Sequence, residues 1–212
     1  MYTEIYGIAL RSLLISSTAT LLALVWSIPF TVKLVSIRHE SKEAIVGVFN
    51  ALIGLPTVLV GLVLYSIFSC SGPLGFLELL YTPYIIIIGE SILITPLLIS
   101  LLYEIFNRAY NEYWELALTL GADKFQACKL IIREIISDVF VVSLIGFSRA
   151  IGELGVALIV GGNIKGYTRV FTTAIALEVE KGEFGTAIAL GLLLFIVVLS
   201  VILTARVIRR RV

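Results

Sequence analysis

Five stretches of the sequence are each long and apolar enough to cross a lipid bilayer. A spanning helix needs about 20 mostly apolar residues, and the stretches that qualify are residues 9–34, 44–68, 84–103, 139–160 and 186–205. The chain of 212 residues is 59% hydrophobic and 15% charged, whereas a soluble domain carries about 25% charged residues. The sequence therefore predicts an all-α, polytopic membrane helix bundle of five transmembrane helices, formed by a single domain, residues 1–212.

The basic residues predict how this bundle is oriented. Sorted by the five stretches, 11 of the 16 Lys and Arg residues fall on one side, 4 on the other, and Arg149 lies within a span. The basic side is expected to be cytoplasmic, so the N-terminus lies outside and the C-terminus inside the cell membrane. The first stretch exceeds the roughly 7–15 apolar residues of a signal peptide, and we expect it to be retained as the first span.

The longest polar segment, residues 107–137, is placed in the cytoplasm by this map. Its apolar residues recur at helical spacing up to Gly121, a residue suited to end a helix with positive φ. Asp123 and Gln126 have the spacing of a capping box that would start a second helix. We call residues 112–133 the elbow, and expect a helix, a glycine break and a second helix. An amphipathic segment lying on the membrane surface is the alternative.

The elbow resembles the EAA loop of ABC-type import permeases. The family pattern is Glu-Ala-Ala, three residues, Gly, nine residues and Ile-x-Leu-Pro; here Glu115, Ala117, Gly121 and Ile131 match it, while Leu116 replaces an Ala and Arg133-Glu134 replace Leu-Pro. In that family the loop forms coupling helices, here between spans 3 and 4, that sit in a groove of a cytoplasmic ATPase. The resemblance implies an ATPase contact made by Glu115, Leu116, Ala117, Leu120, Gly121 and Ala122.

A second group of motifs is similar to permeases of the tungstate, molybdate and sulfate importers, and closest to the tungstate members. It comprises residues 147–155 (FSRAIGELG) and 160–177 (VGGNIKGYTRVFTTAIAL), with residues 54–61 and 71–75 fitting the same group. The resemblance implies an oxyanion permease that works as two copies of this chain, with two ATPase subunits and an extracytoplasmic oxyanion-binding protein. Tungstate is the expected substrate, followed by molybdate and then sulfate.

The chain lacks a G-x-x-x-x-G-K-[ST] phosphate loop, so ATP and Mg are expected on the partner ATPase and no cofactor on this chain. We expect no catalytic residues and no metal site: the only histidine is His39, and the two cysteines, Cys70 and Cys128, lie far apart. A formal net charge of +1 gives no general attraction to nucleic acid. An intramembrane enzyme and a non-transport assembly subunit are the competing classes.

Candidate residues for the substrate pathway follow the second group of motifs: Ser148, Gly152, Gly155, Gly161, Gly162 and Asn163. Glycines in or near a span either leave backbone lining a cavity or let helices pack closely. Asn163, Thr168, Thr172 and Thr173 are neutral donors for an anion, or equally caps and turns. The residues alone leave both alternatives open.

Three ionisable residues lie within the predicted spans: Glu90, Arg149 and Glu153. Arg149 and Glu153 are four residues apart and so share one helical face. An unpaired charge in a membrane costs on the order of 3 kcal/mol, and mutual pairing is the expected solution. Glu90 is a second candidate partner for Arg149, and direct contact between Arg149 and a passing anion is the functional alternative.

Overall fold

The computed structural model describes residues 2–35 and 39–211, and these residues form helices and no strands. The helices are α1 (Tyr2–Val35), α2 (His39–Leu52), α3 (Thr57–Phe68), a short 3-10 helix η1 (Gly75–Leu77), α4 (Pro83–Thr119), α5 (Lys124–Ile151), α6 (Gly155–Gly161), α7 (Phe171–Glu180) and α8 (Phe184–Arg211). The predicted all-α class is confirmed.

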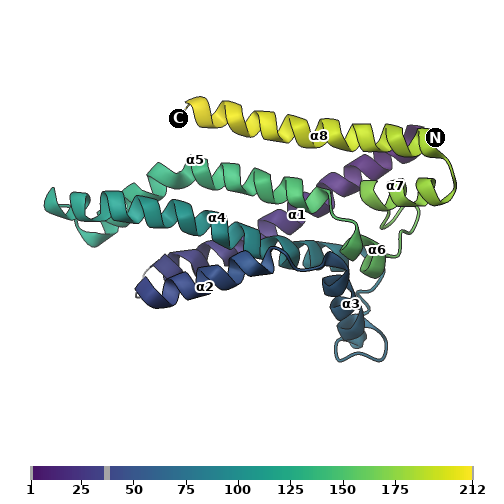
Figure 1. Cartoon of the computed structure of the whole chain (residues 1–212), viewed down its shortest axis with the longest axis horizontal. Helices are drawn as coiled ribbons and strands as arrows, with labels where there is room; N and C mark the ends of the chain where they lie inside the picture. The colour runs from purple at the N-terminus through teal and green to yellow at the C-terminus, as the bar shows by residue number, and fades with distance from the viewer. Residues whose placement is uncertain (1, 36–38, 212) are drawn as a thin grey trace.

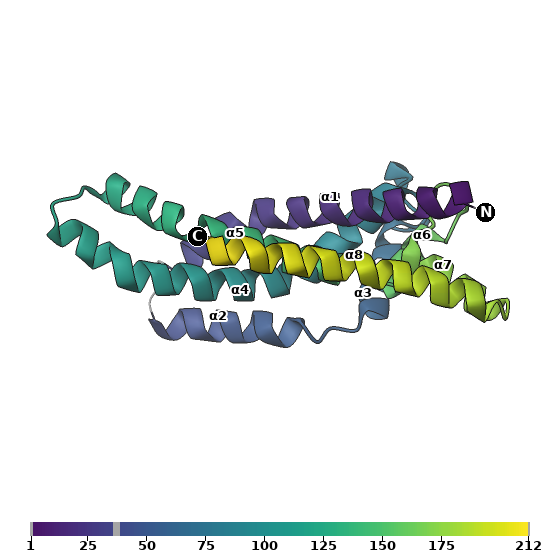
Figure 2. The same cartoon turned by 90° about the horizontal axis from the view of Figure 1, so that it is seen from above.

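The long helices lie roughly along one axis, as Figures 1 and 2 show, with the N-terminus of α1 and the C-terminus of α8 toward opposite ends. Three helical segments have the length and hydropathy of a membrane span: Glu4–Val35, Pro83–Thr119 and Phe184–Thr204. A fourth candidate is the pair Lys42–Leu52 and Thr57–Phe68, which is bent by 92°. The number of five spans therefore stays a prediction.

Two of the five predicted spans are broken rather than continuous. The second, residues 44–68, is interrupted between α2 and α3 where Pro56 lacks an amide donor, and α3 turns away from the long axis (Figure 1). The fourth, residues 139–160, is interrupted at residues 152–154 between α5 and α6. Conversely, α4 and α5 run without interruption through most of the segment that the sequence assigned to a separate loop, because no Gly or Pro occurs between residues 97 and 120.

The centre of the bundle is the contact between α1 and α4. The buried face of α1 carries small and hydroxyl-bearing residues at helical spacing: Ser12, Ser16, Ala19, Thr20, Ala23, Ser27 and Thr31. Small residues let transmembrane helices approach closely. The hydroxyls of Ser12 and Thr20 donate to the carbonyls of Ile8 (2.8 Å) and Ser16 (2.7 Å) within α1 itself. Both hydroxyl groups thus have a hydrogen-bond acceptor, which lipid would not supply.

Three apolar clusters follow one another through the described part of the bundle. The first joins α1, α4 and α5 around Leu98, Leu102 and Ile135, the second joins α3, α4 and α6 around Leu64, Ile86 and Val156, and a smaller third joins α1, α7 and α8 around Phe171. α8 lies at the periphery, with only 11% of its apolar window buried. The structure thus has a well-packed interior formed by α1, α4, α5 and α6, and an outer helix whose apolar surface suits lipid.

The two cysteines test the orientation of this bundle. Both are exposed; Cys70 follows α3 and Cys128 lies in the first turns of α5. Figure 1 shows α3 and the start of α5 toward opposite ends of the long axis. A membrane-impermeant thiol reagent applied to intact cells should label Cys70, and should label Cys128 only after permeabilisation. Single Cys→Ser variants assign each signal, and labelling of both cysteines from the same side would contradict the predicted topology.

Candidate functional site

The elbow is a tight reversal between two long helices, and Figures 1 and 2 show α4 and α5 running side by side to this common tip. α4 ends at Thr119, Gly121 has a φ of +89°, and α5 begins at Lys124. The amide of Ala122 donates to the carbonyl of Ala117 (3.0 Å). Because residues with a Cβ rarely adopt such a positive φ, Gly121 is what lets the chain reverse in so few residues.

The start of α5 is fixed by the predicted capping box. The Gln126 amide donates to the Asp123 carboxylate (2.8 Å), and the Asp123 amide donates to the Gln126 side-chain oxygen (2.9 Å). α5 then passes through Arg133 and Glu134 without a break, as expected for a sequence without the family's proline. The helix–glycine–helix geometry of the elbow is confirmed, whereas its coupling role stays a prediction.

Large apolar side chains are exposed at the tip of the elbow, beyond the apolar spans. Leu120 is 79% exposed and Phe125 78% exposed. Leu116 and Glu115 are also exposed, whereas Ala117 is buried. Sequence reasoning included Leu120 and missed Phe125, although an aromatic residue between Lys124 and Gln126 in a segment too polar to enter the membrane was a usable signal.

Arg149 and Glu153 form the predicted ion pair at the end of α5. The Arg149 Nη1 atom donates to Glu153 Oε2 at 2.7 Å; the Arg149 side chain is 42% exposed and that of Glu153 is 4% exposed. The other carboxylate oxygen, Oε1, accepts from the amide of Gly155 (2.9 Å), the first residue of α6. Glu153 therefore holds Arg149 and also satisfies a backbone amide freed by the break in the helix.

The breaks in the two interrupted spans meet. A Cβ added to Gly155 would lie 2.6 Å from the Thr57 hydroxyl and 3.1 Å from the Val58 amide nitrogen, so the starts of α6 and α3 are in direct contact. Beside them is a cavity of about 540 Å³ lined by Arg149, Gly152 and Glu153 together with Thr57 and Leu158. Gly152 is exposed there, and a Cβ on it would meet nothing closer than 3.7 Å.

The remaining pathway candidates lie in closely packed positions. A Cβ on Gly161 would lie 2.6 Å from Ile86 Cδ1, and one on Gly162 would lie 2.6 Å from the Tyr81 ring. The Ser148 hydroxyl donates to the Leu144 carbonyl within α5 (2.9 Å). These contacts favour helix packing at Gly161 and Gly162, and the structure brings Gly152 and Gly155, rather than all six candidates, to the cavity beside Arg149.

The loop between α6 and α7 directs its polar groups into the protein. The buried Thr168 hydroxyl donates to the Gly161 carbonyl (2.6 Å) and accepts from the Ile164 amide (2.9 Å). Asn163 has a φ of +50°, and its side-chain oxygen accepts from Arg169 Nε (3.1 Å). The Thr172 hydroxyl donates to the Glu153 carbonyl (2.7 Å), and Thr173 bonds to Val170. All four neutral donors therefore take part in local structure.

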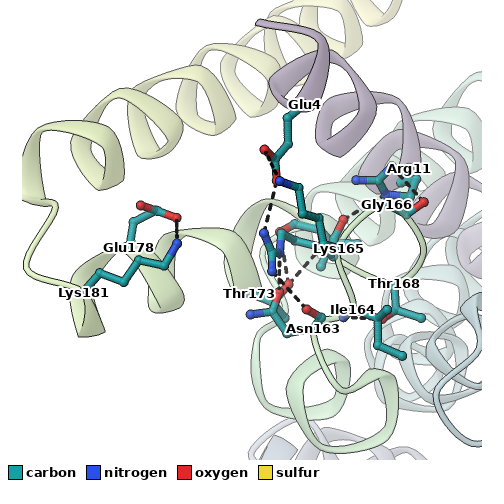
Figure 3. Close-up of polar contacts among 12 residues, drawn as sticks. Glu4, Arg11, Asn163, Ile164, Lys165, Gly166, Thr168, Thr173, Glu178 and Lys181 are labelled. Carbon is teal, nitrogen blue, oxygen red and sulfur yellow. Dashed lines mark hydrogen bonds and ion pairs between the residues drawn. The ribbon is translucent and has the colours of Figure 1, made fainter. Parts of the chain in front are cut away.

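The same loop is attached to the first helix, which sequence reasoning did not anticipate. Lys165 Nζ lies 3.2 Å from one carboxylate oxygen of Glu4, as Figure 3 shows, and Arg169 Nη1 lies 3.2 Å from the other. Arg11 Nε donates to the Arg169 carbonyl (3.1 Å), and the Phe171 amide donates to the Ser12 hydroxyl (2.9 Å). Lys181, in contrast, pairs with Glu178 (2.7 Å) at a separate place. No sequence pattern links positions about 160 residues apart.

Arg149→Ala should lower the stability of the protein more than it changes its selectivity. The substitution leaves the nearly buried Glu153 carboxylate without its cation, which should reduce the free energy of unfolding by about 2–3 kcal/mol, less than for a fully buried pair because Arg149 is partly exposed. Thermal unfolding of the purified protein in detergent measures the loss.

Lys181→Ala is the matched control, since it removes an ion pair of the same length, 2.7 Å, from an exposed position. Its expected effect is at most about 1 kcal/mol. An Arg149→Ala protein that is as stable as the control variant and transports a different anion would refute the structural reading of this pair.

Comparisons with known proteins agree with the resemblance seen in the motifs. Residues 26–212 match the family described as binding-protein-dependent transport system inner membrane component. The chain is 42% identical to the tungstate uptake system permease protein of Peptoclostridium acidaminophilum over 92% of this chain and 85% of that protein. It is 34% identical to a probable anion ABC transporter permease protein of Haloferax volcanii (94% and 88%) and 28% identical to the molybdenum transport system permease protein of Azotobacter vinelandii (85% and 84%).

With a family match across most of its length and apolar helices long enough to cross a bilayer, this chain belongs to the binding-protein-dependent transport system inner membrane component family and is a multi-pass membrane protein, as its motifs predicted.

Proposed function

We propose that this chain is the membrane-spanning subunit of an ATP-driven importer of an oxyanion, and that this oxyanion is tungstate. Two copies form the pathway, two separate ATPase subunits bind ATP and Mg in the cytoplasm, and an extracytoplasmic binding protein delivers the anion. Each copy is a single domain, residues 1–212, with five spans, its N-terminus outside and its C-terminus inside. Family membership and the named relatives support this proposal.

The observation that carries the proposal is the elbow with its exposed apolar tip. Leu120 and Phe125 lie at the end of the bundle where the polar segment leaves the apolar part of α4. Exposed apolar side chains of this size on a rigid turn are typical of a protein contact. A groove of a cytoplasmic ATPase is the partner that the family implies, and Glu115 and Ala117 lie in the last turns of α4, directly before the turn at Gly121.

The two helices that meet at the elbow can transmit movement into the membrane. α4 continues from Thr119 back to Glu90 without interruption, a helical length of about 44 Å. α5 runs from the elbow to Ile151, directly before Gly152 and the break at the cavity. A displacement of the tip by a closing ATPase would therefore reach the pathway as a rigid-body movement of packed helices.

The substrate pathway in this proposal passes the place where the two breaks meet. Discontinuous helices that expose backbone to a cavity near the middle of the membrane are the usual form of transporter sites. Gly152 and Gly155 line the cavity at the two breaks, whereas Ser148, Gly161, Gly162 and Asn163 are packed outside it. Selectivity among similar dianions resides mainly in the binding protein, because the polar groups of the outer loop, between α6 and α7, form hydrogen bonds within this chain.

Replacing Phe125 by Asp should weaken binding of the ATPase to the permease. The charge would enter an apolar contact whose anchor side chains are each worth about 2 kcal/mol or more, so retention of the ATPase during detergent purification should fall at least about tenfold. Leu120→Asp should act in the same direction. Quantitative co-purification of the ATPase, with permease stability checked by thermal unfolding, measures both effects.

Phe76→Asp is the matched control, since Phe76 is 77% exposed in the loop between α3 and α4, away from the elbow. It should leave ATPase retention unchanged. Equal retention by all three Asp variants would contradict the placing of the ATPase contact at the elbow.

Proteoliposomes containing the permease, its ATPase and its binding protein should accumulate tungstate in an ATP-dependent manner. Uptake should be competed by unlabelled tungstate at lower concentration than by molybdate, and least by sulfate, because the chain is 42% identical to a tungstate permease, 28% identical to a molybdenum permease and 26% identical to a sulfate permease. A higher apparent affinity for molybdate would move the assignment to that anion, and preference for sulfate would contradict the tungstate proposal.

A further inference from the structure

Glu90 is an acidic side chain buried inside the membrane bundle with one carboxylate oxygen unused. It lies in α4 and is 2% exposed. Among the described residues, its Oε2 atom has no hydrogen-bond partner, and the side chain of Ser16 in α1 lies beside the carboxyl group. Burying a polar atom without a hydrogen-bond partner costs free energy in a protein interior, and more in a membrane. The unpaired oxygen of Glu90 therefore indicates a role beyond packing.

Gly89, next to Glu90 in α4, packs against Val156 of α6, which brings Glu90 toward the break that follows α5. The charged groups that act on Glu90 there are Arg149, in the last turn of α5, and Glu153, in the break itself. One guanidinium therefore lies near two carboxylates. Glu153 has both oxygens occupied, one by Arg149 Nη1 (2.7 Å) and one by the Gly155 amide (2.9 Å). In this conformation the Arg149 guanidinium is paired with Glu153, and within the part of the chain that the structure describes no cation pairs with Glu90.

The surroundings of Arg149 leave room for it to move. Its side chain is 42% exposed and lines the cavity of about 540 Å³. Gly152, which follows it at the break in the span, has no Cβ to obstruct a rotation, and the nearest atom to an added Cβ would be the Ser148 carbonyl oxygen at 3.7 Å. α4 packs against both α5 and α6, with the Gly89 backbone against Val156, so a shift at the break changes the distance between Arg149 and Glu90.

We propose that Glu90 is a positioning residue for transport: it receives the Arg149 guanidinium when the span breaks rearrange, so that Arg149 exchanges Glu153 for Glu90 between the two conformations of the transporter. This inference rests on the proposed function, because it requires two alternating conformations. The exchange keeps the guanidinium paired in both conformations. It also explains the unused oxygen of Glu90, which is unsatisfied here because its partner is occupied elsewhere in this conformation.

Glu90→Gln tests the exchange in the full permease–ATPase complex. The substitution preserves the shape of the side chain and removes its charge, so the conformation seen here keeps its Arg149–Glu153 pair and the thermal unfolding midpoint should stay equal or rise. ATP-driven tungstate uptake in proteoliposomes should fall by about tenfold to hundredfold, the equivalent of a lost hydrogen bond to a charged group. Glu90→Asp, which keeps the charge, should restore part of the uptake.

Glu104→Gln is the control, an exposed acid on the same helix, and should change neither quantity. Uptake by Glu90→Gln within twofold of wild type would overturn the proposal. A midpoint lowered as far as in Arg149→Ala would overturn it too, because Glu90 would then be holding the present conformation together.

A double-mutant cycle adds a measurement that needs no transported anion. In Glu153→Gln the guanidinium should move to Glu90, so the unfolding midpoint should fall less than in Glu153→Gln/Glu90→Gln, and the two changes should be strongly non-additive. Additive changes would overturn the exchange. Failure of the wild-type complex to take up any oxyanion would instead refute the proposed function, and the cycle would still report whether Glu90 and Glu153 share Arg149.

Discussion

The rest of the structure depends on which groups form hydrogen bonds with the backbone where two helices are interrupted inside an apolar bundle. Lipid offers no hydrogen bonds, so a broken span survives only where protein supplies them. At the second break the Glu153 carboxylate does so: it accepts from the Gly155 amide and is held by Arg149. A single side chain thus starts α6 and neutralises the arginine, and the contact of α6 with the start of α3 follows from the position it fixes.

That arrangement lies at the far end of α5, the helix that begins at the elbow. The elbow is rigid because its turn is set by Gly121 and by the reciprocal bonds of Asp123 and Gln126. α4 and α5 carry this rigidity directly to Glu90 and to Arg149. Side chains in such packed helices switch between discrete arrangements rather than deforming gradually. A movement of the elbow along α5 would therefore change which of the two carboxylates pairs with the Arg149 guanidinium.

The sequence predicted the features that depend on neighbours along the chain. The elbow follows from Gly121 and the Asp123–Gln126 spacing, and the Arg149–Glu153 pair from a separation of four residues. The bend at Pro56 was not predicted, because a proline in an apolar stretch permits a kinked span as well as a broken one, and the 92° turn depends on α3 packing against α6. The contacts of Glu4 and Arg11 with the loop at residue 169 are equally tertiary.

The loop between α6 and α7 shows that a residue can carry the resemblance to anion permeases while its polar group is bonded within the chain. Its residues carry the most specific resemblance, yet Thr168 bonds to Gly161 and Ile164, Asn163 to Arg169, and Arg169 to Glu4. These bonds hold the loop against α1 and fix the start of α7, whose Thr172 hydroxyl donates to the carbonyl of Glu153. The residues that carry the resemblance therefore bond to one another, to α1 and, through Thr172, to the break beside Arg149.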